Sequence, residues 1–200
     1  MKTVLVFNFV WIFSFAVVGQ DQAKLKPEIW GVTVSLPYMN SYKYFDYDVN
    51  KGATKSGFGG LGLALFYKSG RNKVSLNYGL TADLPAPVGP IDFGHEGTRS
   101  QIGSRIVDFI YHRNIFKKVY VISGINLTKY KYNFLSYVDT IPSYNKHDNS
   151  FGLLMGAEYV FEKTFSMAAL YRPAISSQDV RKYKHLLTLD FRFDINIRKK

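Results

Sequence analysis

Strict alternation of apolar and polar side chains is the feature that most restricts how this chain can fold. From His185 the sequence reads HLLTLDFRFDINI, and its apolar members are Leu187, Leu189, Phe191, Phe193, Ile195 and Ile197. Polar or charged residues occupy every position between them. Because neighbouring side chains of a strand point to opposite faces, this period of two predicts a β-strand with one apolar and one polar face.

The same pattern recurs along the chain and predicts five further strands, over 30–36, 61–67, 73–84, 151–161 and 165–171. Two less regular extended segments cover 101–112 and 118–130. In the first of them the apolar parity changes after Ile106, which predicts a β-bulge that leaves Arg105 and Asp108 on the same polar face. The total is eight strands.

The segments between these strands alternate in length. Short turns are expected at 69–72, 113–117 and 162–164, whereas the other connections are long and rich in Gly, Pro, Tyr, Asp and Asn. Short and long connections in strict alternation are typical of an up-and-down barrel with turns at one rim and loops at the other. The fold class predicted is all-β, an eight-stranded antiparallel up-and-down transmembrane β-barrel.

Alternation alone does not say which face is inside, because a soluble lipocalin-like barrel alternates too. The polar face here carries mostly Gly, Ser, Thr, Ala and Asn with a few charges, which suits a narrow lumen better than a water-facing surface. The apolar face is bulky and uninterrupted, as contact with lipid requires. Aromatic residues expected in interfacial girdles are Tyr67, Tyr78, Tyr111, Tyr159, Phe161, Phe165 and Tyr171. The membrane barrel is favoured, and the soluble barrel remains the alternative.

The N-terminus predicts export. Lys2 precedes an uncharged apolar run over 4–18, which ends at Gly19-Gln20-Asp21 and is typical of a secretory signal peptide. We expect residues 1–19 to be removed, with Ala16 as the other exit considered, and 20–200 to form a single outer-membrane barrel domain. An uncleaved anchor is the alternative, although 15 apolar residues are short of the roughly 20 that a spanning helix needs.

Charge and cysteine content exclude several classes of protein. With no Cys, the chain has no disulfide, thiolate metal site or cysteine nucleophile. With 26 Lys plus Arg against 15 Asp plus Glu, the net charge is +11, and basic residues gather at the two expected rims. Those at the turn rim are Lys68, Arg71, Lys73, Arg113, Lys117, Lys118, Arg198, Lys199 and Lys200. Those in the loops are Lys43, Lys51, Lys55, Lys146, Arg181, Lys182 and Lys184, where lipopolysaccharide phosphates would be the neighbours.

The signal peptide, the eight amphipathic strands, the short inner turns and the final strand together resemble the small bacterial outer-membrane β-barrels of the OmpA and OmpX type. The segment YRPAI…YKHLLTLDFRF is similar to members found in Bacteroidetes. The resemblance covers roughly 28–197 and is architectural. It departs at the last residues, because that family usually ends on an aromatic residue and here Ile197 is followed by Arg198-Lys199-Lys200.

The candidate site is a polar lumen. Eight strands enclose space for little more than their own side chains, so we expect charged residues of both signs to pair and fill the interior. These are Arg105, Asp108, Glu158, Arg172, Asp190, Arg192 and Asp194. A small-ligand or lipid passage is an alternative.

Catalysis is not expected. A lipid-A-modifying enzyme would need a Ser and a His near the outer rim, and the candidates are His95, Glu96, Ser100, Ser143, His147, Ser177, Asp179 and His185. They form no recognised motif, and no two His share a metal-ligand spacing. We expect no catalytic residues, cofactor or metal. The partners expected are outer-membrane lipid, lipopolysaccharide and the barrel-assembly machinery, with a monomeric state and no nucleic acid, although Lys129-Tyr130-Lys131-Tyr132 alternates basic and aromatic residues.

Overall fold

The computed structural model describes residues 28–46, 50–84, 98–137, 142–177 and 183–199, and eight strands account for most of them. The strands are β1 (Glu28–Asp46), β2 (Lys51–Ser69), β3 (Asn72–Leu84), β4 (Thr98–Phe116), β5 (Val119–Ser136), β6 (Tyr144–Val160), β7 (Phe165–Ser177) and β8 (Tyr183–Lys199). Within these ranges, no helix has the length and apolarity needed to cross a bilayer. The signal peptide expected over 1–19 lies outside the described residues and stays a prediction.

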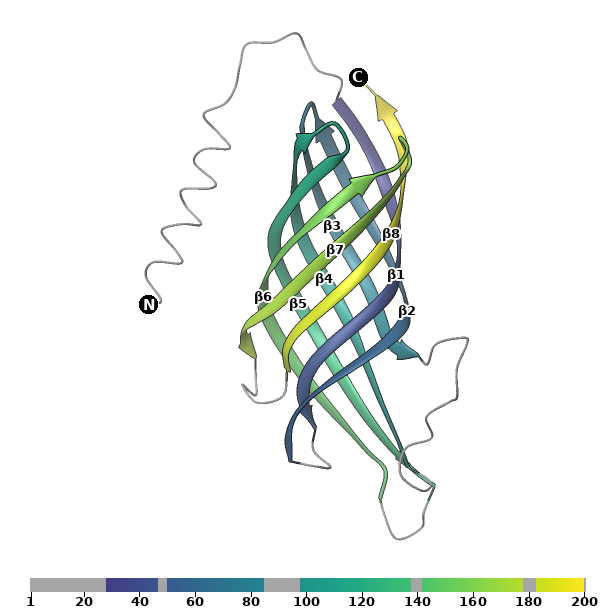
Figure 1. Cartoon of the computed structure of the whole chain (residues 1–200), viewed down its shortest axis with the longest axis vertical. Helices are drawn as coiled ribbons and strands as arrows, with labels where there is room; N and C mark the ends of the chain where they lie inside the picture. The colour runs from purple at the N-terminus through teal and green to yellow at the C-terminus, as the bar shows by residue number, and fades with distance from the viewer. Residues whose placement is uncertain (1–27, 47–49, 85–97, 138–141, 178–182, 200) are drawn as a thin grey trace, which may run out of the picture.

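Each strand pairs antiparallel with the next in sequence, and β8 returns to pair with β1, so the sheet closes into a barrel. This confirms the predicted fold class of eight antiparallel strands in up-and-down order. Figure 1 shows the barrel with the start of β1 and the end of β8 at one rim. The β2–β3, β4–β5 and β6–β7 turns lie at that rim, called here the turn end, and the strand ends that the other connections join lie at the opposite rim, called the loop end.

The strands are longer at the loop end than the sequence predicted. The β1–β2 connection spans only 47–50 rather than a long loop, because the hairpin ladder continues from Ser41↔Ser56 to Asp46↔Lys51. This stretch is rich in Lys, Tyr, Ser, Thr and Gly on both faces. Because polar and aromatic residues occur on both faces, hydrophobic periodicity could not detect this part of the hairpin.

The predicted bulge near Ile106 is wrong. The β3–β4 and β4–β5 registers run without a shift through that position, so Ile106 faces the interior together with Ile102 and Ile110. The bulge would be needed only if every apolar side chain of the strand faced outward. A small lumen is itself a packed core, and β-branched residues fit it.

The outer wall of the barrel carries a continuous apolar band. Large apolar side chains point outward on neighbouring strands at matched register, as in Tyr78↔Val107, Val107↔Leu127 and Leu127↔Phe151, and each of these four is at least 39% exposed. At the turn end, aromatic residues flank the band, with the rings of Trp30 and Tyr67 4.8 Å apart. The apolar surface of this barrel is therefore on its outside.

Candidate functional site in the barrel lumen

A bidentate ion pair spans the middle of the lumen. Arg172 on β7 donates from Nη2 to Asp108 Oδ2 at 2.9 Å and from Nε to Oδ1 at 3.2 Å, and Asp108 lies on β4. Both side chains are buried. Asn77 Nδ2 also donates to the Asp108 carboxylate at 3.1 Å, and Arg172 Nη1 donates to Thr188 at 2.9 Å. Four strands are therefore joined through the interior by one charge-assisted network.

A second group of charges fills the lumen toward the turn end. Lys73 Nζ lies 2.6 Å from Asp194 Oδ2, while Thr33 donates to Asp194 Oδ1 at 2.6 Å. Arg192 lies 3.9 Å from the carboxylate of Glu158 and 3.8 Å from that of Asp190. Beyond this layer, an open hollow of about 580 Å³ faces out of the turn end. Lys73 was expected on the rim, but its side chain is buried inside, with Nζ 4.5 Å from the centre of the Phe66 ring.

One buried hydrogen-bond chain has the order of groups found in acyl-transfer enzymes. Ser75 Oγ lies 3.2 Å from His112 Nε2, and His112 Nδ1 lies 2.9 Å from Glu158 Oε2. Geometry of this kind can activate a serine, but only where a substrate reaches the oxygen. Ser75 is 4% exposed, and the cavity beside it is about 10 Å³, which is room for one water at most. We therefore assign the Ser75–His112–Glu158 hydrogen-bond chain a structural role, which is to satisfy buried polar groups.

Toward the loop end, tyrosine rings replace the charges. Buried aromatic side chains from three strands pack together around the axis, and they are Tyr42, Tyr44, Tyr130, Tyr132, Tyr183 and Phe134. Ring centres lie 5.4 Å apart for Tyr130 and Tyr183 and 5.9 Å apart for Tyr44 and Tyr132. Aromatic residues were expected on the outer wall, and this inner cluster was not predicted, although Tyr130 and Tyr132 share the inward parity of Asn126 and Thr128.

Lys55 on β2 and Asp83 on β3 link neighbouring strands beside the tyrosine cluster, because Lys55 is directly opposite Tyr42 in the β1–β2 ladder. Lys55 Nζ lies 3.0 Å from Asp83 Oδ2 and donates to the Ser100 carbonyl at 2.6 Å, while the Ile102 amide donates to Asp83 Oδ1 at 2.8 Å. Lys55 was expected among the loop lysines near lipopolysaccharide. It is instead engaged inside the barrel, because its position shares the inward parity of Ala53 and Gly57 rather than the outward parity of Ser56.

The structure places six of the seven predicted lumen residues inside the barrel. Asp108, Glu158, Arg172, Asp190 and Arg192 are buried, and Asp194 lies at the turn-side mouth with 23% of its side chain exposed. The seventh placement is wrong, because Arg105 points outward and is exposed. With no bulge at Ile106, the outward parity of Val107 and Phe109 continues to Arg105.

Among the described residues, those considered for catalysis are not brought together. Ser143 Oγ accepts from the Ser136 amide at 2.9 Å, His185 Nδ1 lies 3.3 Å from the Tyr171 hydroxyl, and His147 is exposed on the outer wall. His95, Glu96 and Asp179 lie outside the described residues, as does the side chain of Ser177. Over the parts of the chain that the structure describes, no three His, Asp or Glu side chains gather as a metal site would require.

A closed ring of eight antiparallel strands, apolar outside and polar inside, defines the class of small barrels of the outer-membrane type. Solved structures with this fold include three proteins of low sequence identity to this chain. Ail, the attachment invasion locus protein of Yersinia pestis, solved in complex with the heparin analogue sucrose octasulfate, has a TM-score of 0.56 at 12% identity, covering 86% of this chain and 100% of Ail.

Neisserial surface protein A has a TM-score of 0.50 at 12% identity, covering 84% of this chain and 97% of that protein. A major outer membrane protein from Thermus thermophilus has a TM-score of 0.51 at 14% identity, covering 83% of this chain and 99% of that protein. No protein-family model and no curated protein sequence matches the chain. The chain thus shares the fold of these outer-membrane barrels.

Proposed function

We propose that this protein is an exported, integral outer-membrane β-barrel with a filled lumen, and that its role is structural or one of surface interaction rather than catalysis. The observation that carries the proposal is the inversion of the barrel's polarity. Leu65, Leu127 and Ile195 are each more than half exposed on the outer wall, whereas Asp108, Arg172 and Glu158 are buried within. Water would make such a wall unstable, but lipid stabilises it.

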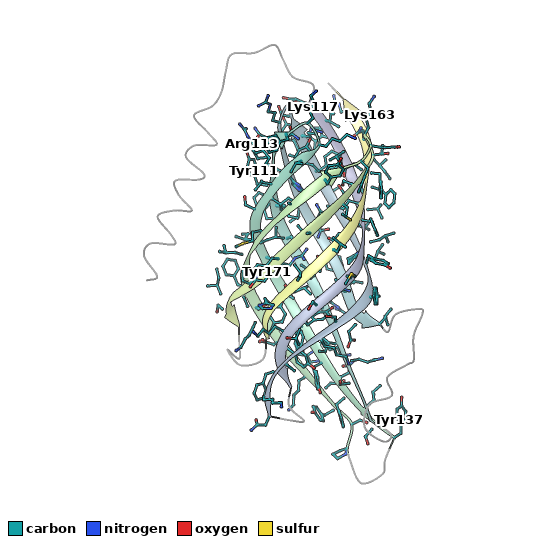
Figure 2. The ribbon with its side chains drawn as sticks, viewed as in Figure 1. Tyr111, Arg113, Lys117, Tyr137, Lys163 and Tyr171 are labelled. Carbon is teal, nitrogen blue, oxygen red and sulfur yellow. The ribbon has the colours of Figure 1, made fainter. Side chains whose placement is uncertain are left out.

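The side chains at the ends of the barrel also support a position in the membrane. Figure 2 shows Arg113, Lys117 and Lys163 at the turn end, with Tyr111 next to Arg113, and Tyr137 at the opposite end. Basic side chains beyond an aromatic row are typical of a membrane–water boundary. We place the turn end in the periplasm and the loop end outside the cell, with the ion-paired lumen closed to diffusion.

Fractionation and gel mobility test the proposal. The full chain, expressed in a Gram-negative host, is expected in the outer membrane, and its folded form is expected to migrate differently from the heated form. Recovery from the periplasm, or a mobility unaffected by heating, would instead support the soluble barrel. A planar-bilayer recording is expected to show no steady conductance, and a steady open current would contradict the filled lumen.

The lipid-A-modifying alternative has its own measurement. Mass spectra of lipid A from hosts with and without the gene are expected to be identical in acylation and phosphate pattern. A change that depends on the gene, and that disappears in a Ser75→Ala variant, would reassign the Ser75–His112–Glu158 chain to catalysis.

A further inference from the structure

We propose that the outer wall of β4, β5 and β6 holds a binding site for a phosphorylated, multiply acylated glycolipid of the outer leaflet, with Arg105, Lys129 and Lys131 as the phosphate ligands. The inference rests on the proposed membrane location and adds a specific site to it. All three side chains are exposed and face away from the lumen.

Strand register gathers these cations into one patch. Arg105 is directly opposite Lys129 across the β4–β5 ladder, and Lys131 is directly opposite His147 across the β5–β6 ladder. The Cβ atoms of directly opposed residues are about 4.5–5.5 Å apart in a regular sheet, and like charges at such positions repel one another. No ion pair recorded among the described residues involves Arg105, Lys129 or Lys131, so the described part of the chain supplies none of them with a counter-charge.

The patch lies where the apolar band ends. On β4 the outward side chains change from Val107 to Arg105, and on β5 they change from Leu127 to Lys129. At this level a lipid changes from acyl chain to headgroup. The cations therefore stand at the depth of the headgroup phosphates in the outer leaflet.

Two surface hollows meet at Arg105 and Lys129 and differ in chemistry. The hollow nearer the loop end has a volume of about 280 Å³ and is lined by Lys131, His147 and Gly103. Because Gly103 has no side chain, the space opposite Lys131 is open. The hollow nearer the turn end has a volume of about 620 Å³ and is lined by Tyr78, Val107, Leu127 and Phe151. A cationic hollow that adjoins an apolar one on its loop-end side fits a molecule with phosphate at one end and acyl chains at the other.

Native mass spectrometry of the full-length barrel, released from phosphatidylcholine vesicles containing bisphosphorylated lipid A, tests the site. The triple variant Arg105→Gln/Lys129→Gln/Lys131→Gln is expected to lose affinity by about fivefold per charge, on the order of 100-fold in total. The matched control, Arg71→Gln/Lys117→Gln/Lys163→Gln, removes the same charge from exposed turn-end positions, away from the proposed site, and is expected to bind as the parent does.

Each other outcome overturns the site. Equal losses in both triple variants would mean general attraction to the protein's positive charge rather than binding at this site. Equal binding of dephosphorylated lipid A would mean that phosphate is not recognised. If phosphatidylglycerol binds as tightly as lipid A, or if inorganic phosphate at about 10 mM displaces it fully, the ligand is any anion rather than the glycolipid. Heat-dependent gel mobility of every variant separates these outcomes from a failure of membrane insertion, which would contradict the proposed function itself.

Discussion

The two halves of the lumen are filled by different chemistry. Toward the turn end and the middle, ion pairs such as Asp108–Arg172 and Lys73–Asp194 cross the space between strands. Toward the loop end, the rings of Tyr42, Tyr130 and Tyr183 fill it. Ion pairs are weakened where water enters, whereas packed rings exclude water without needing a partner charge. One narrow lumen is therefore filled mainly by paired charges in one half and mainly by packed rings in the other, where Lys55–Asp83 is the ion pair that accompanies the rings.

The largest effect is expected from breaking the central pair. Arg172→Met leaves Asp108 buried without its cation, and we expect the free energy of unfolding to fall by about 3–5 kcal/mol. Urea unfolding of the barrel in detergent micelles measures it. The double variant Asp108→Asn/Arg172→Met removes both charges and is expected to recover most of the loss. A double variant as unstable as the single one would show that the pair's charges are not what matters.

A smaller effect is expected in the tyrosine half. Tyr130→Ala removes a ring packed between Tyr44 and Tyr183 and leaves a cavity, and we expect a loss of about 3 kcal/mol in the same measurement. Tyr130→Phe is the matched control, because the Tyr130 hydroxyl is buried without a hydrogen-bond partner among the described residues. It is expected to be neutral or stabilising. If Tyr130→Phe costs as much as Tyr130→Ala, this half depends on hydrogen bonds as well.

The smallest effect is expected at the turn-side end of the ionic half. Glu158→Gln keeps the shape of the side chain but removes its negative charge. The Glu158 carboxylate accepts a hydrogen bond from Ser166 at 2.5 Å and lies beside His112 and Arg192. We expect a loss of about 1–3 kcal/mol in the free energy of unfolding. Ser166→Ala removes only one neutral donor and should cost less. The reverse order would mean that the Glu158 charge is not stabilising where it lies.

Sequence reasoning succeeded where one strand face meets a uniform apolar environment. β3 and β8 carry such faces, and the predicted first and last residues of both strands lie within two residues of those observed. It failed at Ile106 and Arg105 because apolar residues also fill the lumen, so chemical type does not reveal direction. It failed again at Tyr130, whose ring closes against strands that come near β5 only in the folded ring. Contacts of that kind depend on closure and leave no periodic signal.

Closure of the ring also determines the order in which the chain can mature. Thr33 on β1 donates a hydrogen bond to Asp194 on β8, 161 positions away. β1 therefore cannot pair with β8 until the end of the chain has been synthesised. Until then both strands present unpaired backbone edges, which are templates for association with other chains. Joining such distant segments is slow. Until the ring closes, the chain therefore needs protection from premature pairing with other chains.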